Sequence, residues 1–342
     1  MKVNRRQFVE QSVRVAAGMS VLGGAGAGWI EAKEGKPVAA EPAIPIVDTH
    51  QHLWDLSKLR LPWLKGAGRL NRSFVMKDYL EATEGLGVVK SVYMEVDVDP
   101  ADKVAEAEYV IELCRQRKWP TCAAVIGGRP AEPGFRQYIT RFKDSPYIKG
   151  VRHILPGPES GKAFFLEKPF LDGIRLLGEL GMSFDLCMPP AALLDGAKLV
   201  GLCPDTRFIL DHCGNADVKM FLPPERQEST EKALAARRFV DHWRASIDEL
   251  AKRKNLVCKI SGIVATVPKQ WTPDDLAPIV NHCLDCFGPD RVMFASDWPV
   301  CTQGAPLRRW VEALGQIVAN RSEADQRKLW GENAVRFYGL RG

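Results

Sequence analysis

Long apolar runs and a large surplus of one charge are both absent from this 342-residue sequence. No run reaches the roughly 18 apolar residues that span a bilayer, which excludes a membrane-spanning protein. The formal charge is only +5. Residues 1–28 hold four basic residues against one acidic residue, so they carry most of that charge. The remainder of the chain therefore has no basic surplus that would favour nucleic acid as a partner.

Cysteines are present, but a paired spacing typical of disulfide frameworks is not. The nine cysteines are odd in number and mostly lie in apolar runs, which predicts buried free thiols. Cys283 and Cys286 have C-x-x-C spacing beside His282, yet they lie in a segment of helical period with no second pair. We therefore expect neither a zinc site nor a redox centre there.

The first thirty residues have the pattern of an export signal. Arg5 and Arg6 precede an apolar residue, and a weakly hydrophobic stretch rich in alanine and glycine follows. This is typical of the twin-arginine pathway and predicts export to the periplasm in the folded state. The alternative is a short amphipathic helix, which the glycines at the end of the stretch disfavour. Residues 31–44 are predicted to be a linker, and residues 45–342 the folded domain.

Short apolar runs alternate with segments of helical period throughout this domain. Most of the runs are nearly continuous, as in parallel strands that are buried on both faces. Eight repeats over about 250–300 residues predict a single (β/α)₈ TIM barrel. A doubly wound sheet is the alternative, but no G-x-G-x-x-G follows the first strand. The predicted strands are Pro45–His52, Lys90–Asp97, Cys122–Gly128, Ile148–Leu155, Met182–Pro189, Arg207–Gly214, Leu256–Ile263 and Val292–Pro299.

Polar residues follow these strands where a barrel would place its active site. His50 and His52 end the first strand, and their i, i+2 spacing puts both imidazoles on one face, where they can share a metal ion. The alternative is that both rings bond to the backbone. Asp297 ends the apolar eighth strand, and a buried carboxylate needs partners. Other polar residues at strand ends are Glu95, Asp97, Arg152, His153, Asp185, His212 and Lys259.

Several of these motifs together resemble the amidohydrolase superfamily, and within it the lactonase branch that includes fuconolactonase-like and pyrone-dicarboxylate lactonase-like enzymes. The resemblance extends from Ile46 to Tyr338. Its motifs are Val47–Trp54, Lys149–His153, Leu210–Gly214, Cys258–Gly262 and Phe294–Pro299. It implies a TIM-barrel hydrolase with a mononuclear divalent-metal site at His50 and His52. Asp297 would be a ligand or general base, and His212 would lie beside the bond that breaks.

The sequence departs from the superfamily pattern at the fifth strand. Members that hold a metal tightly usually supply a histidine there, whereas residues 182–188 contain none. We therefore expect at most one zinc or manganese ion, weakly held or absent, with Glu95, Asp185 or Cys187 as candidate substitutes for the missing ligand. Without a metal, His212, Arg152 or Lys259 would supply the positive charge.

The expected reaction is hydrolysis of a lactone of a sugar acid or a related carboxylated ring. Asp297 would accept the proton of the attacking water, and a metal or a cation would stabilise the oxyanion. Arg152 and His212 complete the expected catalytic set. The expected substrate-binding residues are Glu95, His153, Lys259, Trp298 and Trp54.

The sequence also leaves alternatives to this reading. One alternative is a metal-dependent non-oxidative decarboxylase of the same superfamily. The other is an exported protein that binds sugar acids without catalysis. One structural alternative is that Arg152, His153 and Lys259 only neutralise carboxylates within the barrel. Another is that Trp54 and Trp298 only pack against loops. The sequence does not specify the oligomeric state.

Overall fold

The computed structural model describes residues 44–160 and 163–341. The export segment predicted for residues 1–30, and all of the predicted linker except Ile44, lie outside these ranges. Within them, no helix combines the length and the apolar character needed to cross a bilayer.

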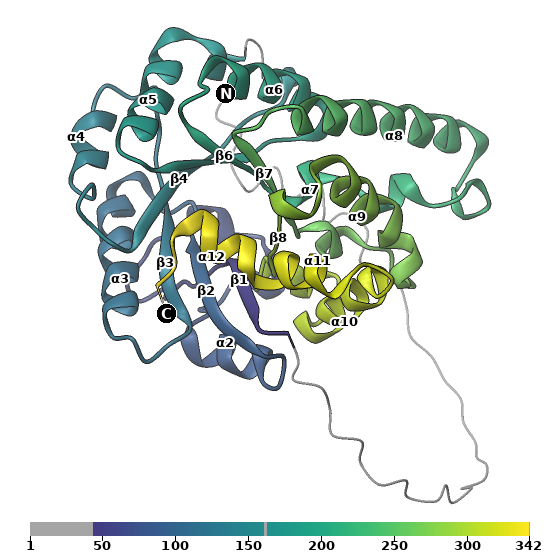
Figure 1. Cartoon of the computed structure of the whole chain (residues 1–342), viewed down its shortest axis with the longest axis horizontal. Helices are drawn as coiled ribbons and strands as arrows, with labels where there is room; N and C mark the ends of the chain where they lie inside the picture. The colour runs from purple at the N-terminus through teal and green to yellow at the C-terminus, as the bar shows by residue number, and fades with distance from the viewer. Residues whose placement is uncertain (1–43, 161–162, 342) are drawn as a thin grey trace, which may run out of the picture.

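Eight parallel strands form one sheet in the order of the chain, which confirms the predicted (β/α)₈ barrel (Figure 1). Seven ladders join each strand to the next. The first and last strands approach each other through a parallel bridge between Gln51 and Trp298. The strands are β1 (Ile46–Gln51), β2 (Val88–Met94), β3 (Thr121–Gly127), β4 (Ile148–Ile154), β5 (Ser183–Cys187), β6 (Arg207–Leu210), β7 (Leu256–Ile260) and β8 (Val292–Phe294).

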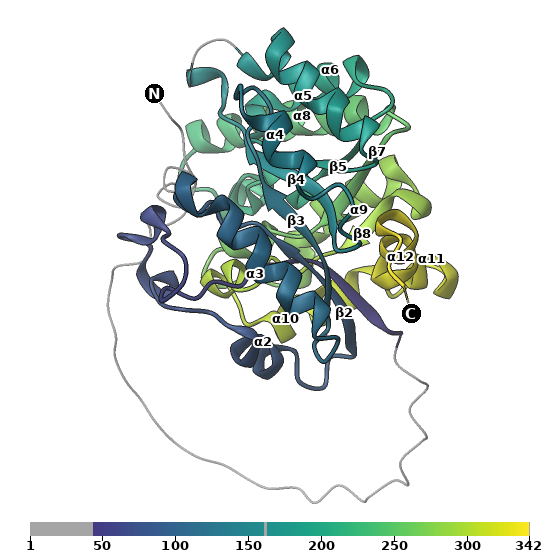
Figure 2. The same cartoon turned by 90° about the vertical axis from the view of Figure 1, so that its left-hand side faces the viewer.

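Helices follow the strands and cover the outside of the barrel. Figure 2 shows α3 lying along the outer face of β2 and β3. The helices are α2 (Met76–Thr83), α3 (Lys103–Arg115), α4 (Phe135–Thr140), α5 (Lys168–Glu179), α6 (Leu193–Leu202), α7 (His212–Asn215), α8 (Thr230–Ala251), α9 (Pro273–Phe287), α10 (Leu307–Val318), α11 (Glu323–Arg327) and α12 (Asn333–Tyr338), with a π-helix at Lys328–Glu332 between the last two.

The core has two layers, as the barrel geometry requires. The larger layer lies between the strands and the surrounding helices, where apolar side chains of both are buried. A smaller layer fills the interior and includes Val92, Val125 and Met293. Tyr338, at the end of α12, packs against this inner layer. The C-terminal segment therefore covers the amino ends of the strands and leaves the carboxyl ends to carry polar groups.

All eight strands end before the predicted apolar runs do, and after two of them the chain turns sharply. Beyond β6, the residues His212–Asn215 all have positive φ angles between 50° and 65°. After β8, Asp297 also has a positive φ of 54°. Such angles are uncommon for residues other than glycine and are found where surrounding contacts hold the backbone in place. The turns place His212 and Asp297 at the barrel mouth.

Candidate functional site

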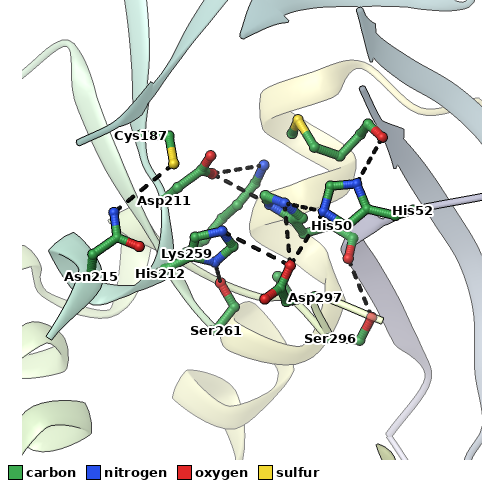
Figure 3. A network of polar contacts seen from close by, with 12 residues as sticks. His50, His52, Cys187, Asp211, His212, Asn215, Lys259, Ser261, Ser296 and Asp297 are labelled. Atoms are coloured by element: carbon green, nitrogen blue, oxygen red, sulfur yellow. Dashed lines mark hydrogen bonds and ion pairs between the residues drawn. The ribbon is translucent and has the colours of Figure 1, made fainter. Parts of the chain in front are cut away.

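His50, on β1, and His52, directly after β1, point their Nε2 atoms toward each other at the mouth of the barrel (Figure 3). These atoms lie 3.2 Å apart. The Nδ1 atom of His52 lies 3.0 Å from the carbonyl oxygen of Met94, and that of His50 lies 3.4 Å from Asp211. Because each Nδ1 faces an acceptor, the ring proton is favoured there, which leaves the Nε2 lone pairs at the mouth.

Asp297 brings a carboxylate to the same point. Its Oδ1 atom lies 3.3 Å from Nε2 of His52, 3.7 Å from Nε2 of His50 and 4.0 Å from Nε2 of His212. All four side chains are almost fully buried. The structure therefore brings together the three expected metal ligands and the expected catalytic histidine.

The donor set at the mouth fits a divalent metal ion. Ligands about 2.1 Å from one tetrahedral ion lie about 3.4 Å apart, close to the separations of 3.2, 3.3 and 3.7 Å seen here. Burial lowers the pKa of His50 well below its ordinary value, and this outweighs the opposing effect of Asp211, so the imidazole is a neutral ligand. His212 lies close enough to share the ion with His50 and Asp297.

Hydrogen bonds to Asp48 join the carboxyl ends of β1 and β8. Its Oδ1 atom accepts hydrogen bonds from the backbone N–H groups of His50 and Ser296, and its Oδ2 atom accepts from the hydroxyls of Ser296 and Tyr79. Ser296 Oγ in turn accepts from the backbone N–H of Trp298. The residues on both sides of Asp297 are thus fixed relative to His50, which positions the carboxylate.

His212 is fixed by β7 and by the turn that follows it. Its Nδ1 atom lies 3.0 Å from Ser261 Oγ. Gly262 has a φ of +73°, and a Cβ atom on this residue would lie 2.5 Å from Cβ and Cγ of His212. The ring therefore stands directly on the backbone of a glycine, and Nε2 faces Asp297. A larger residue at position 262 would displace the imidazole.

Arg152 and Glu95 form a buried ion pair behind His50. The guanidinium donates from Nε to Glu95 Oε1 at 2.7 Å and from Nη2 to the Glu95 carbonyl oxygen at 2.8 Å. Its Nη1 atom lies 3.1 Å from Nε2 of His50. Both side chains are only 2% exposed. Arg152 thus reaches the site, whereas the carboxylate of Glu95 is used to hold it.

Lys259 lies deeper in the barrel than its expected role in substrate binding requires. Its ammonium group contacts Asp185 at 2.5 Å and Asp211 at 3.3 Å, and the side chain is fully buried. Although burial alone lowers the pKa of Lys259, Asp185 and Asp211 raise it above the ordinary value. The structure thus places Lys259 beside Asp211, which faces His50.

Of the candidates for the missing ligand of the fifth strand, two are engaged elsewhere. Asp185 pairs with Lys259, and Glu95 pairs with Arg152. The third, Cys187, ends β5, and its Sγ atom lies within 4.8 Å of ligand atoms of Asp211 and His212. Of the three candidates, Cys187 is therefore the one that lies beside potential ligand atoms of His212 and Asp211.

The structure does not bring the other three expected substrate-binding residues to the site. His153 follows the inward-facing Arg152 and points outward, where its ring packs against Phe164 and Phe170. Trp54 is fully buried and donates from its indole N–H to a backbone carbonyl. Trp298 is 3% exposed and packs its ring against Phe74 and Tyr79. In this structure all three rings are therefore engaged in packing contacts away from the histidines.

Sequence reasoning missed the residues that hold the site in place, namely Asp48, Tyr79, Asp211, Ser261 and Ser296. Asp48 and Asp211 were visible as carboxylates within or directly after apolar strands, where a buried charge requires partners. Burial alone raises the pKa of Asp211, but the contacts with Lys259 and His50 hold this pKa well below its ordinary value. Nothing in the sequence distinguished the hydroxyl groups from ordinary core residues.

Comparison with known proteins agrees with this geometry. The model of the amidohydrolase family matches residues 47–340. An L-fucono-1,5-lactonase of Burkholderia multivorans is 28% identical over 311 residues, which cover 86% of this chain and 96% of that protein. An L-rhamnono-gamma-lactonase of Scheffersomyces stipitis is 20% identical and covers 86% of this chain and 98% of that protein. A crystal structure of an amidohydrolase from B. multivorans with bound zinc is 25% identical, with a TM-score of 0.71, and covers 87% of this chain and all of that one.

Proposed function

The chain belongs to the amidohydrolase family, and we propose that this hydrolase opens the lactone of a sugar acid by attack of water on the carbonyl carbon. One observation carries the proposal: the Asp297 carboxylate lies within 3.3 to 4.0 Å of the Nε2 atoms of three histidines at the barrel mouth. Two relatives that match across most of this chain are lactonases of sugar acids, which supports the choice of a cyclic ester.

Asp297 accepts the proton of the attacking water in this proposal. His50 and His52, with Asp297, would hold a divalent ion, which when bound lowers the pKa of a water and polarises the carbonyl oxygen. His212, fixed through Nδ1 by Ser261, presents Nε2 beside Asp297. It stabilises the ring oxygen that leaves as the ester bond breaks, and this oxygen takes up the proton that Asp297 accepted from water. The leaving group remains attached to the same molecule, so the product is the open hydroxy acid.

Charge within the barrel refines the substrate class. Arg152 is paired with Glu95, and Lys259 with Asp185 and Asp211, so neither of these cations is left over for a second carboxylate on the substrate. A site with its cations already paired favours neutral, hydroxylated rings. We therefore propose a sugar-acid lactone in place of a carboxylated ring.

The test is a substrate panel assayed with the purified full-length chain. L-fucono-1,5-lactone, L-rhamnono-gamma-lactone and 2-pyrone-4,6-dicarboxylate are incubated with protein that has been treated with a chelator and then supplied with zinc, manganese or no metal. Release of acid is followed with a pH indicator. We expect turnover of sugar lactones to exceed that of the pyrone and to rise with metal. Efficient cleavage of p-nitrophenyl acetate or a phosphotriester, with all lactones untouched, would overturn the proposal.

A further inference from the structure

A second group of potential metal ligands lies outside the barrel, between α8 and α9. Asp248 is on α8, and His282 and Cys286 are on α9, one helical turn apart. Asp248 Oδ1 lies 3.1 Å from His282 Nε2 and 3.1 Å from Cys286 Sγ. The sulfur lies 3.6 Å from the same imidazole nitrogen. We refer to these three residues as the α8–α9 cluster.

We propose that the α8–α9 cluster binds one zinc ion, with water as the fourth ligand. Zinc lies about 2.3 Å from a thiolate and about 2.0–2.1 Å from an imidazole nitrogen or a carboxylate oxygen. In a tetrahedron these lengths give about 3.6 Å between sulfur and nitrogen and about 3.3 Å between nitrogen and oxygen. The first separation matches the 3.6 Å seen here, and the second is within about 0.2 Å of the 3.1 Å seen here. The sulfur–oxygen separation of 3.1 Å is about 0.5 Å shorter than the tetrahedral edge, because the thiol still donates its proton to the carboxylate, so these two atoms move apart when the ion binds. One carboxylate, one imidazole and one thiol are also a ligand set that suits zinc.

The cluster is rigid on its inner side and open on its outer side. The ring of Trp243, which is fully buried on α8, packs against the His282 ring with centroids 5.2 Å apart. The side chain of Asp248 is 55% exposed and that of His282 is 22% exposed. An ion can therefore enter from solvent and reach three potential ligand atoms that lie 3.1 to 3.6 Å from one another.

The structure also shows that the two cysteines of the C-x-x-C spacing have different surroundings. Cys283 is fully buried in the core, whereas Cys286, one turn further along α9, is partly exposed beside Asp248. The two thiols are thus not partners, and the ligand missing from the sequence motif comes from Asp248, on a different helix. His282 and Cys286, at i and i+4, form the part of the site that the sequence contains.

A nucleophilic role for Cys286 is disfavoured by the same neighbours. Burial and the adjacent Asp248 raise the pKa of Cys286 to about 12, so the thiol keeps its proton. In the metal-free cluster that proton is donated to the Asp248 carboxylate. Zinc would take the place of this proton and bind both the sulfur and the carboxylate, with release of one proton to solvent.

Cobalt titration tests the proposal directly, because a thiolate bound to cobalt gives a charge-transfer band that oxygen and nitrogen ligands do not give. The full-length chain is stripped of metal, kept reduced with a phosphine and titrated with Co²⁺. We expect the band in the wild-type protein, with one more bound ion per chain than in the Cys286→Ser variant. His282→Gln should also lose the band. Asp248→Asn should weaken zinc binding by at least the roughly 10–100-fold that loss of an outer-shell partner costs.

Two matched variants show that any loss is specific to the cluster. Cys122, the other partly exposed cysteine, and His242, which is exposed on α8, both lie outside the cluster. Cys122→Ser and His242→Gln should keep the band and the number of bound ions. Because Cys187 at the barrel mouth is a second thiol beside potential ligands, the titration is repeated in the Cys187→Ser background. There, a protein without the band, or a band that persists when Cys286→Ser is added, would overturn the proposal. Lactone hydrolysis by Cys286→Ser should equal that of the wild type, because the cluster is outside the barrel mouth.

Discussion

Arg152 and Glu95 are joined by two hydrogen bonds in the interior of the barrel, one to the carboxylate at 2.7 Å and one to the carbonyl oxygen at 2.8 Å. The same guanidinium lies 3.1 Å from the Nε2 atom of His50. Glu95 therefore decides where the positive charge of Arg152 lies relative to the histidines. This relationship links the stability of the barrel to the geometry of its mouth.

Glu95→Gln is expected to impair both properties. Breaking a buried ion pair costs about 3–5 kcal/mol of unfolding free energy, because the remaining charge is left uncompensated. Urea unfolding measures this loss, and lactone turnover should fall as Arg152 moves. The comparison variant is Asp172→Asn, which breaks the exposed pair with Lys168 and should cost far less unfolding free energy, because exposed ion pairs contribute little. Equal costs for the two variants would contradict the importance of the buried pair.

Asp297→Asn is expected to keep the fold and to lower kcat by at least about 10²-fold, because the amide cannot accept the proton of water. Circular dichroism should remain that of the wild type, and metal content should fall with the loss of an anionic ligand. Asp290→Asn, at an exposed carboxylate that pairs with Lys328, serves as the control and should retain full turnover. Near-normal activity of Asp297→Asn would remove this residue from the mechanism.

The strands were predictable because a parallel barrel buries both of their faces, and each of the eight apolar runs overlaps an observed strand. The histidine pair was predictable for a similar reason, since residues two apart on a strand share a face. The same rule implies that Arg152 and His153, which are neighbours on β4, cannot both point into the barrel. Because Arg152 faces inward, His153 must face outward. Its packing against Phe164 and Phe170 follows from that alternation.

Contacts between distant segments were beyond the reach of the sequence pattern. Ser296 and Asp48 are 248 residues apart, and their hydrogen bonds exist only because β1 and β8 meet when the barrel closes. The cluster of Asp248 with His282 and Cys286 likewise requires α8 and α9 to pack together. Periodicity locates elements along the chain, but it does not specify which side chains face each other across them.

Glu106 is expected to make stability depend on pH. Burial and the nearby Glu95 raise the pKa of Glu106 to about 8 from an ordinary value of 4.5. Between these two values the folded protein holds a proton that the unfolded chain releases, so the unfolding free energy falls as pH rises. The slope is about 1.4 kcal/mol for each pH unit in this window. Below the window the contribution is fully present, and it is lost as pH passes about 8.

Replacement by glutamine isolates this effect. The Oε1 atom of Glu106 accepts hydrogen bonds from Tyr93 and from the backbone N–H of Val96, and an amide oxygen can accept both. In urea unfolding at about pH 5, 7 and 9, the unfolding free energy of Glu106→Gln should therefore change less with pH than that of the wild type. At the highest pH, Glu106→Gln should be more stable than the wild type. Glu108→Gln, at an exposed position on the same helix, should keep the wild-type slope. Parallel curves for the wild type and Glu106→Gln would show that this carboxyl group is ionised throughout.

Gly262→Ala is expected to impair catalysis through His212. The new Cβ atom would lie 2.5 Å from Cβ and Cγ of the histidine, a contact that forces the ring to move, and the φ of +73° adds backbone strain. Gly87→Ala separates these two effects, because Gly87 has a similar φ of +76° but no atom within 4 Å of its added Cβ. Both variants should lose unfolding free energy from backbone strain, and Gly262→Ala should lose more because of the contact with His212. Only Gly262→Ala should lower kcat, since a displacement of about 1 Å at a reacting group can cost on the order of 10²-fold. If the two variants retain equal turnover at equal stability, the position of His212 does not control the reaction, and its assigned role beside the breaking ester bond is wrong.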